Sequence, residues 1–205
     1  MKKSNQLTKH YCEAYMDAAL IGAKSHCKFL SSQPEFSETY FHKKRGHIIE
    51  YIALAGNHKL LGESFKNSPD SSFKNPSNVT GLSFLNLIVD AAKSGDLKSV
   101  KIVLDNLDRF EDKDTRNYKY NIDCALRYAG ELGHLDVFNH LLTIGANPRQ
   151  WHVIRWTADK GPKNTYERLL QVNKLPLSTK RRDLINICES EAKKVNYEFI
   201  DLSKF

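Results

Sequence analysis

Several patterns that would indicate catalysis or a cofactor are missing from this 205-residue chain. It has no glycine-rich phosphate loop and no Gly-x-Ser-x-Gly elbow. None of its eight histidines lies four residues from another, the spacing that places two imidazoles on one helix face to hold a metal. We therefore expect no cofactor, no metal site and no catalytic residues, with an enzyme of an unrecognised type as the alternative.

Long apolar runs are also missing. No run approaches the roughly 20 residues of a membrane span, and Ala18–Ala23 is too short for the apolar part of a signal peptide. The four cysteines form no CxxC pair, so buried thiols in a reducing compartment are favoured over a disulfide framework. We expect a cytoplasmic protein that is not exported through the secretory route.

The chain has a net charge of +7, and its basic clusters are short. They lie at residues 43–45, 180–182 and 193–194, with an acidic cluster at 105–114. Solvated lysine-rich helix faces explain this composition, because no nucleic-acid recognition motif accompanies it. A basic helical module that binds nucleic acid or an anionic membrane is kept as the alternative function.

The segment Asn121–Pro148 has the pattern of two short helices joined by a tight turn. Leu126 and Ala129 lie three residues apart, which places them on one helical face. Gly133 ends the first helix at a position where a positive φ is often needed. Gly145 ends a second helix, whose spacing is amphipathic. Its apolar stripe consists of Leu135, Phe138, Leu141 and Leu142.

The same segment resembles one ankyrin repeat, because its small, apolar and turn residues occur where that family has them. These residues are Ala129, Gly130, Gly133, His134, Leu135, Val137, Leu141, Leu142, Gly145, Ala146 and Asn147. Any helical hairpin needs a glycine and two apolar stripes, but this combination is more specific. The resemblance implies further units, since one repeat cannot bury its apolar face alone.

Four other segments align with this one on a central glycine. The five anchor glycines are Gly22, Gly56, Gly95, Gly133 and Gly161, with separations of 34, 39, 38 and 28 residues. These values scatter around the ankyrin period of about 33 residues. A Ser/Asn/Pro loop at 67–81 and a charged insertion at 108–120 account for the long separations.

We therefore predict an all-α fold, an ankyrin-like helical repeat stack (solenoid) with irregular terminal caps. It is expected to form one domain over residues 1–205. The approximate units are 11–33, 45–67, 82–107, 120–147 and 149–173, followed by a helical cap or tail at 175–205. The family's Thr-Pro-Leu-His turn is absent, and Pro162 departs from the pattern in the fifth unit. Because that turn ties neighbouring repeats by hydrogen bonds, a less regular stack is implied.

The resemblance also implies a function, which is binding a protein partner without catalysis. In the family, partners contact a concave face built from the loop tips and the ends of the first helices. The corresponding residues here are Lys93, Ser94, Tyr120, Asn121, Asp123, Glu131, Leu132, Arg149, Trp151, Asp159 and Lys160. Tyr120, Arg149 and Trp151 are of the types that dominate interface hot spots. We expect Tyr120, Asn121 and Asp123 in a loop, and Trp156 partly in the core.

The last 31 residues contain two more helical patterns and several glutamates near the C-terminus. A cap that closes the stack is one interpretation. The tail also loosely resembles the Glu-rich tails of bacterial type IV secretion effectors, which often carry degenerate ankyrin repeats. That resemblance implies a protein translocated into a host cell. We expect the chain to be a monomer.

Overall fold

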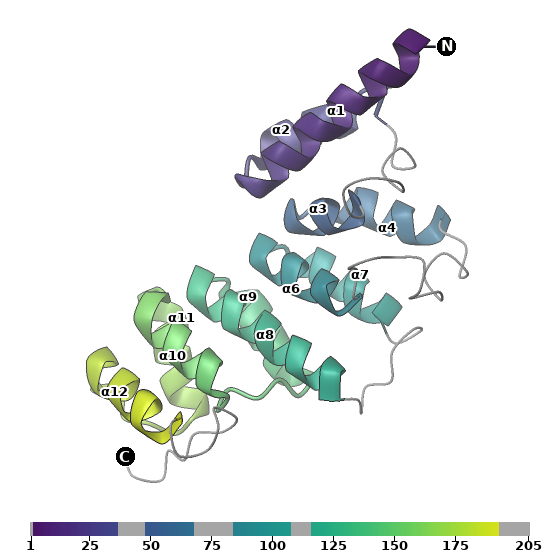
Figure 1. The fold of residues 1–205 in the computed structure, drawn as a ribbon. Coiled ribbons are helices and arrows are strands. Elements are labelled where there is room, and N and C mark those ends of the chain that lie inside the picture. The colour runs from purple at the N-terminus through teal and green to yellow at the C-terminus, as the bar shows by residue number, and fades with distance from the viewer. Residues whose placement is uncertain (1, 37–47, 68–83, 108–115, 193–205) are drawn as a thin grey trace. The chain divides into compact units, whose positions relative to one another are not determined.

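The computed structural model describes residues 2–36, 48–67, 84–107 and 116–192 (Figure 1). Every regular element among these residues is an α-helix, so the predicted all-α class is confirmed. The chain divides into two compact units, Met1–Lys113 and Asp114–Phe205. The predicted loop at 67–81, the basic clusters at 43–45 and 193–194, much of the charged insertion and the final helical pattern of the tail lie outside the described residues.

The described residues of the first unit form three helix pairs. They are α1 (Lys2–Leu20) with α2 (Lys24–Ser31), α3 (Ile48–Leu54) with α4 (His58–Asn67), and α6 (Phe84–Ser94) with α7 (Leu97–Leu107). The first helices of successive pairs touch, since α1 packs on α3 and α3 packs on α6. The second helices α4 and α7 also pack together. The second and third pairs therefore lie against each other in the same orientation, whereas the first pair packs on the second through α1 and α3.

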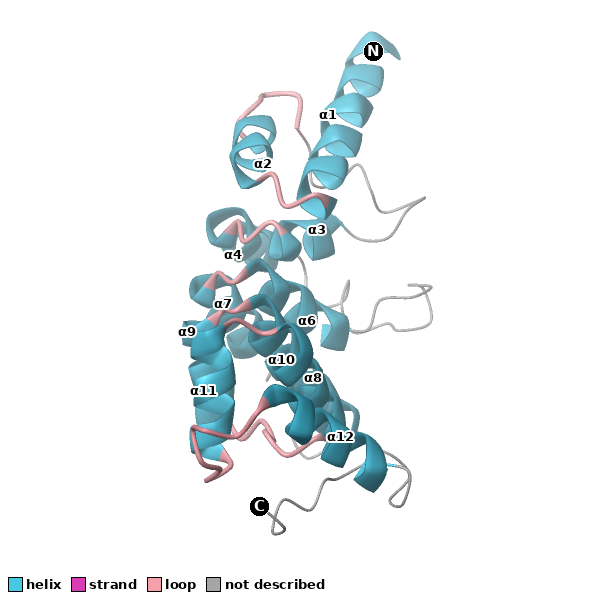
Figure 2. Ribbon diagram, turned by 90° about the vertical axis from the view of Figure 1, so that its left-hand side faces the viewer, coloured by secondary structure: helices cyan, strands magenta, loops and turns pink. Residues whose placement is uncertain are grey.

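The second unit follows the same scheme. Its helices are α8 (Arg116–Leu132), α9 (Leu135–Thr143), α10 (Trp151–Lys160), α11 (Lys163–Val172) and α12 (Arg181–Ala192). Helix α10 packs between α8 and α12, and α11 packs on α9. Figure 2 shows the short turns that join the two helices of each pair. Helix α12 lies in the stretch 175–205, which was predicted as a helical cap or tail, and its packing on α10 extends the row of first helices.

Two glycines show how neighbouring turns approach each other in the second unit. Gly133 has a φ of +83°, and a methyl group at its Cα would lie 2.6 Å from Cγ of Pro162. Gly161 has a φ of −59°, but a methyl group there would lie 2.7 Å from the Gly130 carbonyl oxygen. Gly133 is thus required by its backbone conformation and by packing, whereas Gly161 is required by packing alone.

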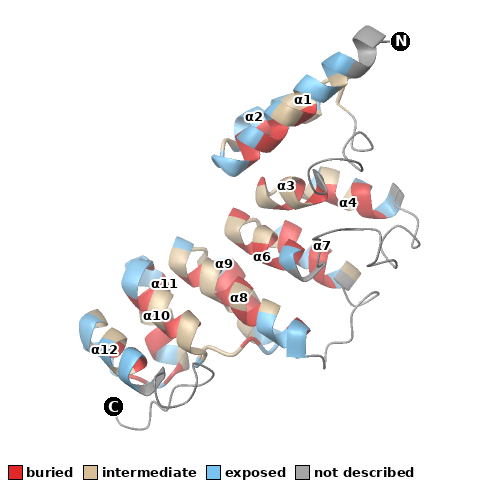
Figure 3. Ribbon diagram, viewed as in Figure 1, coloured by how far each residue is buried: buried red, intermediate tan, exposed pale blue. Residues whose placement is uncertain are grey.

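Apolar residues meet where the helices face one another (Figure 3). The predicted second-helix stripe is confirmed at Phe138 and Leu141, which are fully buried, while Leu135 and Leu142 are half-buried. Other fully buried large residues of this unit are Leu126, Ile154, Leu169 and Leu170. The burial of these residues determines which sides of α8 and α10 face solvent.

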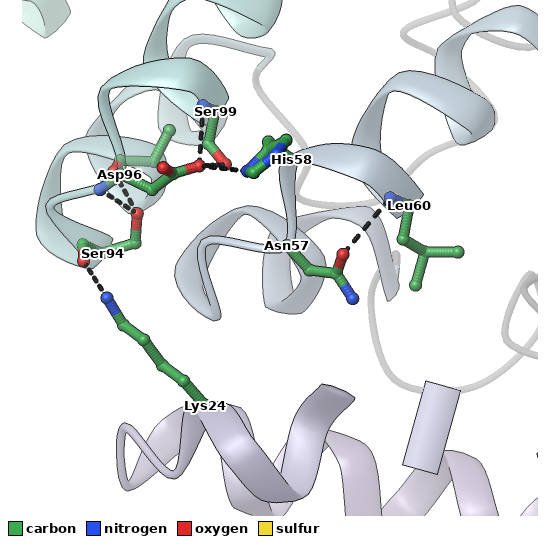
Figure 4. Close-up of polar contacts among 8 residues, drawn as sticks. Lys24, Asn57, His58, Leu60, Ser94, Asp96 and Ser99 are labelled. Atoms are coloured by element: carbon green, nitrogen blue, oxygen red, sulfur yellow. Dashed lines mark hydrogen bonds and ion pairs between the residues drawn. The ribbon is translucent and has the colours of Figure 1, made fainter. Parts of the chain in front are cut away.

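In the first unit, side chains connect the turns of different helix pairs (Figure 4). His58 Nδ1 lies 3.0 Å from Oδ2 of Asp96, which also accepts the backbone N–H of Ser99 at 3.0 Å. Lys24 Nζ donates to the Ser94 carbonyl oxygen at 2.6 Å. The His58–Asp96 contact joins the turns of the second and third pairs, and Lys24 reaches the turn of the third pair from that of the first, although the family's Thr-Pro-Leu-His motif is absent.

Candidate functional site

Two of the eleven residues predicted to bind a partner lie in the first unit. Lys93 Nζ forms an ion pair with Asp90 Oδ1 at 2.8 Å on the same helix. Ser94 is 4% exposed, and its hydroxyl donates to the Ala91 carbonyl oxygen at 2.7 Å. Ser94 is therefore the buried last residue of α6, and Lys24 donates to its carbonyl oxygen.

The other nine residues lie in the second unit, and three of them are in a different element from the one predicted. Tyr120, Asn121 and Asp123 were expected in a loop, but they lie inside α8. The loop prediction is wrong because the amphipathic pattern of α8 begins before residue 120. Tyr118 and Ile122 are already buried and continue the core stripe towards the N-terminus.

Asp123 is 6% exposed and is used inside the unit. Its Oδ1 accepts the backbone N–H of Asn147 at 2.6 Å, which ties the connection between α9 and α10 to α8. Burial raises the pKa of this carboxyl group to about 6, although hydrogen bonds from the Asn147 backbone and the Gln150 side chain act in the opposite direction. The geometry assigns Asp123 to the internal structure of the turn.

Tyr120 is exposed by 59% and lies at the start of a row of side chains along α8. Its ring centroid is 5.9 Å from that of His152, the second residue of α10. A hydrogen bond with Cys124 is the main cause that raises the pKa of the Tyr120 hydroxyl. Burial, followed by the charge of Arg127, lowers the pKa of His152 to about 4, so this imidazole is neutral at pH 7.

Further along the same two helices, three cations surround one indole ring. The Arg127 guanidinium carbon lies 4.8 Å from the Trp156 ring centroid and 4.3 Å from the Tyr128 ring centroid. Lys160 Nζ lies 4.4 Å, and the Arg155 guanidinium carbon 5.4 Å, from the Trp156 ring centroid. All four distances are within the range of cation–π attraction.

Carboxylates from three helices balance these cations. Glu131 lies 3.3 Å from Arg127 and 3.1 Å from Lys160, and its side chain is only 12% exposed. Arg155 lies 3.0 Å from both Asp159 and Glu189, the latter on α12. The pairs Arg127–Glu131 and Arg155–Asp159 have the i, i+4 spacing that suits a helix surface.

We call this surface the α8–α10 face. It consists of Tyr120, Cys124, Arg127, Tyr128 and Glu131 of α8, with His152, Arg155, Trp156, Asp159 and Lys160 of α10. The structure thus brings four predicted residues together, namely Tyr120, Glu131, Asp159 and Lys160.

The remaining predicted residues lie within α8 or α10 or in the connection that precedes α10. Leu132 is 48% exposed at the end of α8. Trp151 is half-buried as the first residue of α10. Arg149 is exposed, and its backbone N–H donates to Asn147 Oδ1 at 2.9 Å. Asn121 donates to the Asn117 carbonyl oxygen within α8 at 2.9 Å.

Arg127, Tyr128 and Arg155 were not predicted, and Trp156 was assigned partly to the core. A sequence pattern that identifies them does exist. The stretches 127–133 and 155–161 read RYAGELG and RWTADKG, so an arginine followed by an aromatic residue precedes both anchor glycines at the same distance. An acidic residue follows each arginine after four positions. A position-by-position comparison of the two predicted repeats that contain these stretches reveals the repeated arginine–aromatic pair.

In the part of the chain that the structure describes, no three His, Cys, Asp or Glu side chains gather closely enough to hold a metal ion. Among the same residues, no helix is both long and apolar enough to cross a membrane.

No protein-family model matches the chain, and no curated protein matches it. A function can therefore be inferred only from the residues themselves, above all those of the α8–α10 face.

Proposed function

We propose that this chain is an ankyrin-like repeat protein whose role is to bind a protein partner. The serial contacts among first helices and among second helices support a repeat stack in each unit. Equivalent turn contacts support it further. The glycine of one turn approaches the residue that follows the next anchor glycine, both at Gly56 with Asp96 and at Gly133 with Pro162.

Partner binding is proposed to take place on the α8–α10 face. The observation that carries this proposal is the group of Arg127, Arg155 and Lys160 around the Trp156 ring. Tryptophan, tyrosine and arginine are the residues most enriched at interface hot spots. Here the aromatic rings are supported by two packed helices, so little side-chain entropy remains to be lost on binding.

The charges of this face indicate the character of the partner. Each of the three cations around Trp156 is within 3.3 Å of at least one carboxylate oxygen of the same unit. A polyanion would have to compete with these internal carboxylates. A protein surface that carries both charges and apolar groups matches such a face better, because it can pair with both signs.

A charge exchange at two exposed neighbours tests the proposal. In the variant Asp159→Lys, Lys160→Glu, the net charge is unchanged, but the contacts of Asp159 with Arg155 and of Lys160 with Glu131 are replaced by repulsion. We expect a protein captured from cell lysate by the tagged wild type at physiological salt to be lost with this variant.

The matched control is Lys163→Glu, Glu167→Lys on α11. This ion pair is also solvent-exposed, with side chains 87% and 41% accessible, and its exchange again leaves the net charge unchanged. The control should capture the same protein as the wild type. Equal capture by both variants would refute the assignment of binding to the α8–α10 face.

A further inference from the structure

The connection between α11 and α12 presents an apolar tip to solvent. The Thr179 backbone N–H donates to the Pro176 carbonyl oxygen at 2.9 Å, which closes a tight turn with Leu177 and Ser178 at its centre. Leu177 is 60% exposed, and both Pro176 and Ser178 are exposed as well. A leucine at the tip of a turn contributes nothing to the core of this unit.

Contacts on both sides hold this turn in place. Leu175 is buried, and its backbone N–H donates to the Leu170 carbonyl oxygen at 2.9 Å. On the other side, the Tyr166 hydroxyl donates to the Thr179 carbonyl oxygen at 2.8 Å. Because Tyr166 lies near the start of α11 and Leu170 lies one turn later, the connection runs back along α11. The exposed tip is therefore supported by the helix beneath it.

Basic residues outnumber acidic ones in the sequence on both sides of the tip. Residues 163–183 contain six basic and two acidic side chains. Lys174, Lys180 and Arg182 are exposed on either side of Leu177 in the sequence. Of the two carboxylates, Glu167 is already 3.7 Å from Lys163, and Asp183 follows the cluster in the first turn of α12. Arg181 is held internally, since it donates to the Ala158 carbonyl oxygen at 2.8 Å and lies over the Tyr166 ring.

We propose that this basic turn, defined by Lys174, Leu177, Lys180 and Arg182, binds the surface of an anionic lipid bilayer. Anionic headgroups attract exposed lysine and arginine, and the long stems of these side chains let an apolar neighbour reach the acyl boundary. Leu177 supplies that apolar group. None of the four residues belongs to the α8–α10 face, so the proposal is independent of the proposed protein partner.

The combination of groups favours a bilayer over other partners. A nucleic acid would use the cations but would gain little from an exposed leucine, since its backbone offers no apolar surface. A protein partner is disfavoured because lysine is depleted from protein interfaces, whereas it is enriched in membrane-surface segments. Of these three kinds of partner, only an anionic lipid surface matches both the excess of basic side chains and the exposed leucine.

Sedimentation of the full chain with vesicles tests the proposal. We expect binding to vesicles of phosphatidylcholine mixed with phosphatidylserine and no binding to phosphatidylcholine alone. The variant Lys174→Gln, Lys180→Gln, Arg182→Gln should weaken partition into the anionic vesicles on the order of 100-fold, since each cation near the surface contributes about fivefold. Leu177→Ser should weaken it about tenfold.

Two control variants isolate the turn from general effects. Lys59→Gln, Lys98→Gln, Lys101→Gln removes the same number of charges from exposed positions of the first unit, and Ile144→Ser removes an apolar side chain that is 42% exposed. Both should bind anionic vesicles like the wild type. Failure of the wild type to bind these vesicles, or an equal loss in the control variants, would overturn the proposal. Duplex DNA binding that depends on the three cations but not on Leu177, without vesicle binding, would assign the turn to a polyanion instead.

Discussion

Asp123 shows at the scale of one residue how burial and titration are linked. Its carboxyl group is buried in the side of α8, and its pKa is raised from the usual 3.8 to about 6. Well below pH 3.8 the group is protonated in both the folded and the unfolded protein, so folding carries no penalty. Well above pH 6 it is ionised in both, and the folded state bears the cost of a buried charge. The corresponding loss of unfolding free energy between these limits is about 3 kcal/mol.

The variant Asp123→Asn removes this titration while keeping an oxygen that can accept the Asn147 N–H. Relative to the wild type, we expect the unfolding free energy of the variant to rise between pH 4 and pH 7 by up to about 3 kcal/mol. Urea unfolding followed by tryptophan fluorescence reports on this unit, because both tryptophans of the chain, Trp151 and Trp156, lie in it. A difference between variant and wild type that is the same at both pH values would show that Asp123 does not titrate in this range.

Leu141 tests the packing of the second unit. This side chain is fully buried in α9, so Leu141→Ala is expected to lower the unfolding free energy by about 2–5 kcal/mol, as cavity-forming substitutions do. The same fluorescence measurement applies. Leu132→Ala, at a leucine that is 48% exposed, is the matched control and should cost much less. A small effect at Leu141 would contradict the burial of the second-helix stripe.

At the scale of elements, two turn glycines of the second unit differ in whether they contact the next helix pair. Gly133 and Gly145 both have positive φ, at +83° and +96°, so alanine is strained at either position. Only Gly133 also contacts a neighbouring turn, where a new methyl group would collide with Pro162, whereas nothing lies within 4 Å of such a group at Gly145.

Comparison of Gly133→Ala with Gly145→Ala therefore separates packing between pairs from backbone strain. We expect Gly133→Ala to be the more destabilising by at least about 1 kcal/mol, since overpacking adds to the strain. Thermal and urea unfolding of the two variants provide the measurement. Equal losses of stability would mean that the Pro162 turn yields freely and does not fix the spacing of the pairs.

The helix pairs could be predicted from the sequence because local rules determine them. Glycine is the residue that adopts a positive φ cheaply, and Gly22, Gly56, Gly95 and Gly133 all have one at the ends of first helices. The apolar spacing likewise predicted the burial of Phe138 and Leu141. Gly161 shows the limit of this reasoning, since a methyl group there would collide with the Gly130 carbonyl oxygen of α8, which is distant in sequence, as well as with the Thr157 carbonyl oxygen of its own helix.

The candidate site was predicted less completely because it depends on contacts between helices. Glu131 is identified by its position before Gly133, but its bond to Lys160 joins residues 29 positions apart. Trp156 was expected to lie partly in the core, and only the packing of α8 on α10 brings Arg127 over its ring. Asp123 was predicted as a contact residue from the position that corresponds to it in the ankyrin family. Its internal role was missed because its hydrogen bond with Asn147 depends on how the chain returns after α9.

At the scale of the whole molecule, the excess of basic residues that gives the net charge of +7 is unevenly distributed. In the second unit, the cations of the α8–α10 face are paired with carboxylates, whereas the basic turn between α11 and α12 has an excess of cations. We infer that the two surfaces serve different kinds of partner. The first of them, the α8–α10 face, is the proposed binding site of the protein partner.

Site-specific photo-crosslinking tests that claim most directly. A photoreactive phenylalanine analogue is placed at Tyr120 or Leu132, which are 59% and 48% exposed on or beside the face, and at Ile144, which is 42% exposed at the end of α9, as the control. After irradiation in cell lysate, we predict that Tyr120 and Leu132 yield the same discrete protein adduct and that Ile144 does not. An adduct obtained from Ile144 alone, or none from either position at the face, would contradict the account.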